Sequence, residues 1–124
     1  MFFLTIDDGW VHDESAATFV RKHRIPVTSF VTGAAIHGDW DYFARMSRYD
    51  SVQNHSMTHK ALSLRSTDLD YEICYTQRFM RRHLGTRPWL LRPPYGAGWM
   101  APYGRQAPIM AKAGSCGITR VVLW

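Results

Sequence analysis

The sequence has no apolar run long enough to cross a membrane. Its longest apolar stretches, such as residues 121–124, are far shorter than the roughly 20 residues that a transmembrane helix needs. It also lacks repeats, linkers and low-complexity tracts. Its 46% hydrophobic and 20% charged residues are typical of a globular protein rather than a disordered one. We therefore expect residues 1–124 to form a single domain.

Cysteine is scarce as well, with Cys74 and Cys116 as the only two. Neither lies in a CxxC pair or at a spacing typical of metal ligands, so a metal site in this chain has no need of them. Two alternatives stay open: one disulfide in an extracytoplasmic protein, or two buried thiols.

A signal peptide is not expected at the N-terminus. Residues 1–4 are apolar, but Thr5, Asp7 and Asp8 follow almost at once, which ends the apolar segment too early. Residues 2–6 instead predict a strand that starts at the beginning of the chain and is buried on both faces.

The net charge of +5 could favour anionic polymers. The basic residues, however, are spread over predicted helices without the interleaved aromatic residues of a nucleic-acid-binding face. We therefore expect a solvated basic surface and no nucleic-acid partner, with attraction to an anionic cell-wall polymer as the alternative.

Short β-rich runs predict strands at residues 2–6, 27–32, 51–54, 89–92 and 118–124. Apolar residues spaced three and four apart predict helices at residues 13–24, 41–48 and 68–84, and weakly at 105–114. Asp13 and Asp41 are the expected N-caps, and Gly85 is the expected C-terminal stop. Residues 33–38 are expected in a loop, and Pro108 is expected to break the last helix.

This alternation predicts an α/β fold in which helical crossovers join parallel strands. In such sheets and barrels, the loops at the carboxyl ends of the strands gather on one face, where active sites lie. Three polar motifs each follow a predicted strand, at residues 7–9, 55–59 and 92–96. We therefore expect these motifs to meet at one site.

Asp7, Asp8 and Gly9 form the first motif. Consecutive strand residues point to opposite faces, so both aspartates can serve one site only where the strand gives way to a loop. Gly9 permits the backbone conformation that such a turn needs. The alternative is an ordinary Asp-Gly turn without a function.

His55 and His59 form the second motif. Residues four apart face the same way if their segment is helical. Ser56 follows His55, so this is not the HExxH motif of zinc proteases. Neutral imidazole suits zinc, cobalt, nickel or iron; the alternative is one surface and one structural histidine.

The third motif runs from Arg92 through two prolines to Tyr95 and Gly96. The prolines stiffen the backbone, Arg92 could pair with a carboxylate, and the Tyr95 N–H could face a developing oxyanion. The alternative is a proline-rich surface turn.

Aromatic residues near these motifs are candidate platforms for sugar rings. Trp10 and Trp99 follow two of the motifs and are the stronger candidates. Trp89 is expected in the core, because it lies inside a predicted strand. The remaining candidates are Trp40 and Tyr103.

In this order, the motifs closely resemble those of the polysaccharide deacetylases with a NodB homology domain, carbohydrate esterase family 4. The matching segments are residues 5–9, 55–59 and 92–96, and the resemblance spans essentially the whole chain. It implies a distorted (β/α) barrel, incomplete here with about five β/α units. It also implies an acetylated polysaccharide substrate and an extracytoplasmic or cell-envelope location.

The resemblance assigns Asp8, His55 and His59 to a divalent metal, with zinc expected first and cobalt or nickel as alternatives. It makes Asp7 the general base and Arg92 its partner. The Tyr95 backbone would contribute to the oxyanion hole. Substrate-binding residues would be Trp10, Pro94, Tyr95 and Trp99.

The chain departs from the family pattern at two positions. Trp10 follows Gly9 where the family commonly has proline, and it adds an aromatic wall; Lys60 follows His59 where proline is also common. The family also carries a later histidine that protonates the leaving group and an Asp-Trp segment. The chain ends at Trp124 before either, so we expect a partial domain whose exposed barrel edge could self-associate.

The expected activity is that of a hydrolase acting on non-peptide carbon–nitrogen bonds. It would remove acetyl groups from peptidoglycan or chitin-type glycans and release acetate. The alternatives are a catalytically impaired glycan- or metal-binding module and an O-acetyl esterase acting on xylan.

Overall fold

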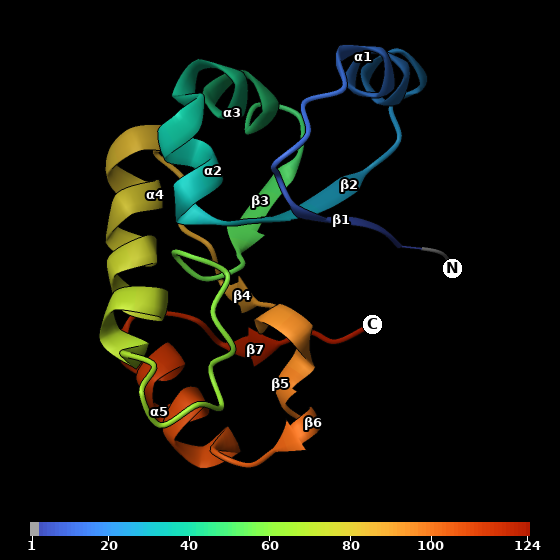
Figure 1. The fold of residues 1–124 in the computed structure, drawn as a ribbon. Coiled ribbons are helices and arrows are strands. Elements are labelled where there is room, and N and C mark those ends of the chain that lie inside the picture. The colour runs from blue at the N-terminus through green and yellow to red at the C-terminus, as the bar shows by residue number, and fades with distance from the viewer. Residues whose placement is uncertain (1–2) are drawn as a thin grey trace.

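The computed structural model describes residues 3–124, apart from the side chains of residues 101–103. Five parallel strands form one sheet in the order β1-β2-β3-β4-β7, as Figure 1 shows. The strands are β1 (Leu4–Asp8), β2 (Val27–Val31), β3 (Ser51–Asn54), β4 (Leu90–Leu91) and β7 (Arg120–Val121). The predicted α/β fold, an incomplete barrel of parallel strands and helices, is confirmed.

Helices and short irregular elements connect the strands. The α-helices are α1 (Glu14–His23), α2 (Gly33–Gly38), α3 (Trp40–Met46), α4 (Thr76–Leu84) and α5 (Gln106–Ser115). The π-helix η1 (Asp70–Tyr75) leads directly into α4. The 3₁₀ turn η2 (Pro94–Gly96) precedes a small second sheet of β5 (Ala97–Gly98) and β6 (Met100–Tyr103). No helix in the described chain is long and apolar enough to span a membrane.

Two apolar clusters form the core between the sheet and its helices. One gathers residues of β2, α2, α3, β3 and α4: Val31, Ala35, Ile36, Phe43, Val52 and Met80. The other, the lower core cluster, includes residues of η1, β4 and α5, and the last two elements lie lower in Figure 1. It comprises Leu62, Leu69, Ile73, Leu91, Ile109, Ala113 and Ile118. Together they hold β2, β3 and β4, and the last two of these strands lead into the second and third polar motifs.

Helix α1 buries none of its residues and lies apart from the other helices in Figure 1. A cavity of about 160 Å³, lined by apolar groups of α1, the sheet and α3, separates it from the body. Its start was predicted correctly: the Asp13 carboxylate accepts hydrogen bonds from Ser15 N and Ala16 N at 2.9 Å.

Strand β1 is not buried on both faces as predicted, because α1 buries none of its residues and leaves a cavity that Ile6 lines. It is also the edge strand of the sheet. Leu4 and Ile6 are 45% and 49% exposed, and Phe2, where the predicted strand begins, lies outside the described residues. An edge strand has a neighbour on one side only. The apolar run therefore indicated a strand correctly but not its surroundings.

Residues 33–38 form helix α2 rather than the predicted loop. The hydroxyl of Thr32 accepts a hydrogen bond from Ala35 N at 3.2 Å and so caps the helix. Asp39, not Asp41, caps α3, since its carboxylate accepts a hydrogen bond from Tyr42 N at 3.1 Å. The glycines at its two ends made this segment resemble a loop. It is helical because Thr32 caps its start and because tertiary packing can override a weak helix propensity.

Helix α5 runs through Pro108 without a break. Pro108 is the third residue of the helix, where a backbone N–H would have no partner within the helix. The predicted helix at 68–84 exists, but its first part is the π-helix η1, for which Asp68 accepts hydrogen bonds from Asp70 N and Tyr71 N. Gly85 ends α4 with φ 68°, as predicted.

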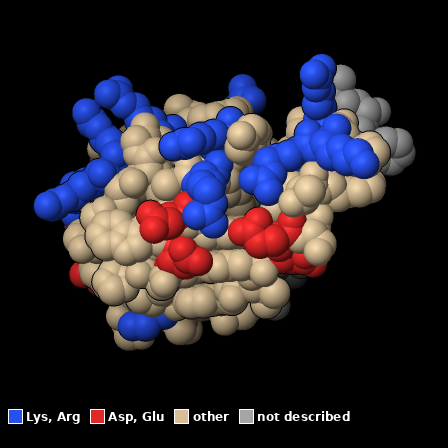
Figure 2. All heavy atoms as spheres, turned by 90° about the horizontal axis from the view of Figure 1, so that it is seen from above, with Lys and Arg blue, Asp and Glu red and all other residues tan. Residues whose placement is uncertain are grey.

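Lys and Arg side chains are spread around the face shown in Figure 2, with Asp and Glu side chains among them. Arg21 and Arg45 both approach Glu14, at 3.7 and 3.5 Å. Such exposed pairs contribute little to stability. On this face, the distribution agrees with the solvated basic surface expected from the sequence.

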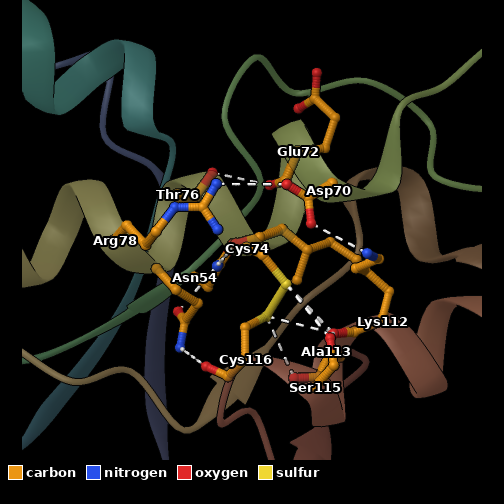
Figure 3. Close-up of a disulfide and its surroundings, with 12 residues drawn as sticks. Asn54, Asp70, Glu72, Cys74, Thr76, Arg78, Lys112, Ala113, Ser115 and Cys116 are labelled. Atoms are coloured by element: carbon orange, nitrogen blue, oxygen red, sulfur yellow. Dashed lines mark hydrogen bonds and ion pairs between the residues drawn. A yellow bond between two sulfur atoms is a disulfide. The ribbon is translucent and has the colours of Figure 1, made fainter.

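Cys74 and Cys116 form a disulfide, with their Cα atoms 5.5 Å apart. Figure 3 shows how it ties η1 to the turn after α5. Close by, Lys112 of α5 donates to Asp70 at 3.0 Å, and hydrogen bonds from Lys112 and then Arg78 lower the pKa of Asp70. Of the two alternatives that the sequence left open, the structure contains the disulfide.

Replacing both cysteines, by Cys74→Ser with Cys116→Ser, should lower the free energy of unfolding by about 2–4 kcal/mol. The disulfide closes a loop over a sequence separation of 42, and opening it raises the entropy of the unfolded chain. Urea unfolding of both proteins, with and without reductant, measures the effect. Equal midpoints under oxidising conditions would contradict it.

Candidate metal centre and active site

The carboxyl ends of the first four strands lie in register. Asp8 of β1 is opposite Val31 of β2, Val31 is opposite Asn54 of β3, and Asn54 is opposite Leu91 of β4. Each polar motif begins at or directly after one of these ends, so segments far apart in sequence become neighbours. This arrangement is the one expected for parallel strands.

Asp8, His55 and His59 form a tight cluster. Oδ1 of Asp8 lies 3.1 Å from Nε2 of His55 and 3.0 Å from Nε2 of His59. The three potential ligand atoms lie within 4.8 Å of one another. His55 is fully buried, whereas Asp8 is partly exposed, so the cluster opens to solvent on one side.

The turn at Gly9 makes this cluster possible. Asp8 has φ 71° and Gly9 has φ 83°, so the chain leaves β1 in the left-handed region at Asp8. Asp7 and Asp8 thereby face the same end of the sheet. A Cβ at Gly9 would lie 2.8 Å from Cγ1 of Val31 and 2.9 Å from Cζ of Phe43, so both its backbone and its surroundings require glycine.

The histidine segment is a turn and not a helix. Ser56 and His59 have φ 71° and 60°. The Ser56 hydroxyl accepts a hydrogen bond from His59 N at 3.0 Å, and the Ser56 carbonyl accepts one from Gly33 N at 3.0 Å. A helix would have placed the two histidines on one face, but here a strained loop brings them together.

The histidine tautomer fits a metal ligand. Nδ1 of His55 lies 2.6 Å from the Arg92 carbonyl, which can only accept, so Nδ1 carries the hydrogen. Burial lowers the pKa of His55, while the bond to Arg92 opposes the shift. Neutral His55 then directs the lone pair of Nε2 at the Asp8 carboxylate, an arrangement that a cation between them would satisfy.

Asp7 lies beside this cluster and is paired with Arg92. Nη1 of Arg92 donates to Oδ1 of Asp7 at 2.7 Å and to the Thr5 hydroxyl at 3.0 Å. The Arg92 guanidinium is buried and lies 4.2 Å from the centre of the Phe30 ring. A buried charge is tolerated when it is paired and hydrogen-bonded.

Trp124 is a member of the site that the sequence did not indicate. Its indole N–H donates to Oδ2 of Asp7 at 2.9 Å, and its ring centre lies 5.5 Å from Cζ of Arg92. No motif signals this role. The strand order could have, because the segment following β7 must run beside the residues that follow β4.

Tyr95 has φ 61° in the turn after the prolines. Its hydroxyl lies 3.1 Å from Nδ1 of His59, and its side chain is exposed. The structure therefore places the Tyr95 side chain beside His59, and the oxyanion role of its backbone N–H stays a prediction. Pro94 beside it is buried.

The tryptophans differ from one another in position. Trp10 is exposed next to the first motif, whereas Trp99 packs partly against the lower core cluster. Trp89 is 46% exposed and not in the core as predicted, because it precedes the two-residue strand β4. Trp40 packs against His83, 4.5 Å between ring centres, and the Tyr103 side chain lies outside the described residues.

Comparisons with known proteins show the family of the chain. The profile of the polysaccharide deacetylase family matches residues 1–121. The fold, an incomplete (β/α) barrel with polar motifs at its strand ends, and this profile match indicate the same class of protein. The chain belongs to the polysaccharide deacetylase family.

Individual relatives are longer than this chain. An uncharacterized protein of Streptomyces coelicolor is 35% identical over 124 residues, which cover 98% of this chain and 47% of that protein. A peptidoglycan-N-acetylglucosamine deacetylase of Listeria monocytogenes is 31% identical over 98 residues, which cover 76% of this chain and 21% of the relative. The chain therefore spans about half or less of the curated relatives it matches.

The solved structures agree in fold. A family 4 carbohydrate esterase from Streptomyces lividans, in complex with acetate, superposes with a TM-score of 0.79 at 26% identity. The match covers 97% of this chain and 60% of the esterase. The parallel strands and helices described above are therefore shared with this esterase.

A Gly9→Ala substitution should lower the free energy of unfolding by roughly 1–3 kcal/mol, because alanine meets both the positive φ and the crowding by Val31 and Phe43. Gly38→Ala is the matched control, since a methyl group added there would have no neighbour within 4 Å and its φ is not in the positive range. Thermal unfolding of the two variants compares them. Equal melting temperatures would refute the requirement for glycine.

Proposed function

We propose that this chain forms the metal-binding part of a polysaccharide deacetylase that removes acetyl groups from N-acetylated glycans of the peptidoglycan or chitin type. The single observation that carries the proposal is the convergence of Asp8, His55 and His59 beside the Asp7–Arg92 pair. The name of the Listeria relative, a peptidoglycan-N-acetylglucosamine deacetylase, supports this substrate class. The products are acetate and a free amine on the glycan.

Asp8, His55 and His59 are the proposed ligands of a divalent ion. Two imidazoles and one carboxylate suit zinc, with cobalt or nickel as alternatives, and leave positions open for water and substrate. When bound, such an ion lowers the pKa of water and polarises a carbonyl oxygen. The partial exposure of Asp8 gives that side of the cluster access to solvent.

Asp7 is the proposed general base. Arg92 and Trp124 each donate to a different oxygen of its carboxylate, at 2.7 and 2.9 Å, and so fix its orientation. Each carboxylate oxygen has two acceptor sites, so Asp7 can still take the proton of the water that attacks the acetyl carbonyl. The Tyr95 N–H is the proposed donor to the oxygen that becomes negative in this step.

The sugar is proposed to lie against Trp10, Pro94, Tyr95 and Trp99. Trp10 and Tyr95 offer exposed rings, and aromatic faces pack well against apolar surfaces. Trp99 contributes less, because part of its ring is used in the lower core cluster.

The disulfide supports an extracytoplasmic or cell-envelope location, because disulfides persist in oxidising compartments. We further propose that residues 1–124 act as one partial domain. The exposed edge strand β1, with Leu4 and Ile6 on its surface, is the proposed route of any self-association.

A glycan- or metal-binding module without catalysis is the second candidate. The described histidines outside the cluster pack elsewhere: His12 stacks on Tyr42 and His37 on Phe79, while His23 packs against Phe19 and His83 against Trp40. None of them reaches the cluster to protonate a leaving group. An O-acetyl esterase is the third candidate, because attack on an ester carbonyl uses the same groups.

Zinc binding tests the metal site. The protein should bind one zinc ion, and His55→Ala or Asp8→Ala should weaken binding more than about 100-fold, beyond the 10–100-fold expected for residues outside the ligand set. His83→Ala is the control, because His83 packs against Trp40 away from the cluster. Chelator competition measures the affinities; unchanged binding by His55→Ala would refute the ligand assignment.

Acetate release tests the reaction. Asp7→Asn should keep zinc binding but lower the rate of release from N-acetylglucosamine oligomers by about 10²–10⁴-fold, the usual contribution of a general base. Acetylated xylan, assayed in parallel, reports the esterase alternative. If the unmodified protein binds zinc but releases no acetate from either polymer, the binding module is the correct function.

A further inference from the structure

Glu72 is a buried carboxylate that the proposed reaction does not use. It lies on the π-helix η1, is 1% exposed, and forms no ion pair with the described lysines or arginines. A buried charge without such a partner must be stabilised by hydrogen bonds. The partners of Glu72 therefore indicate what it does.

All three hydrogen bonds of this carboxylate go to the loop between the two histidines. Oε2 accepts from Met57 N at 3.0 Å and from Thr58 N at 2.8 Å. Oε1 accepts from the Thr58 hydroxyl at 2.5 Å. These three bonds engage two backbone amides and one side chain in the middle of the loop, so Glu72 fixes its shape through the placement of its acceptors.

This loop needs external support. Ser56 and His59 both have positive φ. For a residue other than glycine, this backbone conformation costs free energy of order 1–3 kcal/mol. Helix α2 supports the loop from the other side, where Gly33 N and Ala34 N donate to the carbonyls of Ser56 and Met57. Glu72 supplies the acceptors for the amides, so both sides of the loop backbone are satisfied.

Glu72 is itself anchored to the body of the protein. The Thr76 hydroxyl donates to its carbonyl at 2.9 Å, and Asn54 of β3 donates to the carbonyl of Ile73 at 3.1 Å. Two residues further on, Cys74 is bonded to Cys116. Figure 3 shows the Glu72 side chain pointing away from this disulfide, so the same short helix is fixed on one side and holds the loop on the other.

We propose that Glu72 is a positioning residue for the metal centre. By binding the amides of Met57 and Thr58, it holds the loop in the shape that directs Nε2 of His55 and His59 at one ion. The inference rests on the proposed metal site but adds a residue that does not touch the ion. Residues that orient metal ligands commonly change metal affinity by 10–100-fold when replaced.

Glu72→Gln and Glu72→Leu separate hydrogen bonding from packing. The glutamine oxygen can accept from both amides, and its NH₂ group can donate to the Thr58 hydroxyl, which can rotate to accept. Leucine fills similar space but offers no acceptor. Circular dichroism first checks that both variants are folded, and chelator competition then measures their zinc affinity. We expect the affinity to fall less than about threefold for Glu72→Gln and about 10–100-fold for Glu72→Leu.

Equal zinc affinity in Glu72→Leu and the unmodified protein would overturn the inference. An equal loss in both variants would also overturn it, because charge rather than acceptor geometry would then be responsible. If the unmodified protein bound no zinc, the proposed metal site itself would be wrong, and that result is separate from the comparison of variants.

Hydrogen exchange tests the hydrogen bonds from the Met57 and Thr58 amides to Glu72. It needs neither metal nor a variant that must fold. In the unmodified protein, the amides of Met57 and Thr58 should exchange as slowly as those of strand β3, although they lie in a loop. Exchange at the rate of exposed loop amides would overturn the inference.

Discussion

Arg92 connects the two halves of the site, and the rest of the arrangement depends on it. Its carbonyl accepts the Nδ1 hydrogen of His55 at 2.6 Å, which fixes the tautomer and directs Nε2 at Asp8. Its guanidinium binds Asp7 at 2.7 Å. One residue at the end of β4 therefore orients both a proposed metal ligand and the proposed base, and the prolines after it keep the backbone in place.

The parallel sheet supplies the second constraint. Because the strand ends are in register, short motifs suffice to build a site that spans the chain. The same sheet ends at β1, where half-exposed Leu4 and Ile6 show an apolar edge. Supporting contacts, namely Glu72, the disulfide and Trp124, all join segments that are distant in sequence and hold the strand-end loops in place.

Much of the fold and the proposed ligand set could be predicted from the sequence, because local signals carry them. The apolar runs indicated the strands, and the strand-end positions of Asp8, His55 and His59 indicated a common site. The contacts of Glu72 and Trp124 could not be predicted, since each depends on side chains that meet only after folding. The exposure of Leu4 and Ile6 on β1 could not be predicted either. A run of apolar residues predicts a strand but not what packs against it.

X-ray absorption spectroscopy of the zinc-loaded protein tests the proposed metal site, because it reports the ligands themselves. We expect nitrogen and oxygen ligands at about 2.0–2.2 Å from the zinc ion with the scattering of two imidazoles, and of one imidazole in His55→Ala. A spectrum without imidazole scattering, or an imidazole count unchanged by this substitution, would show that His55 does not bind the ion.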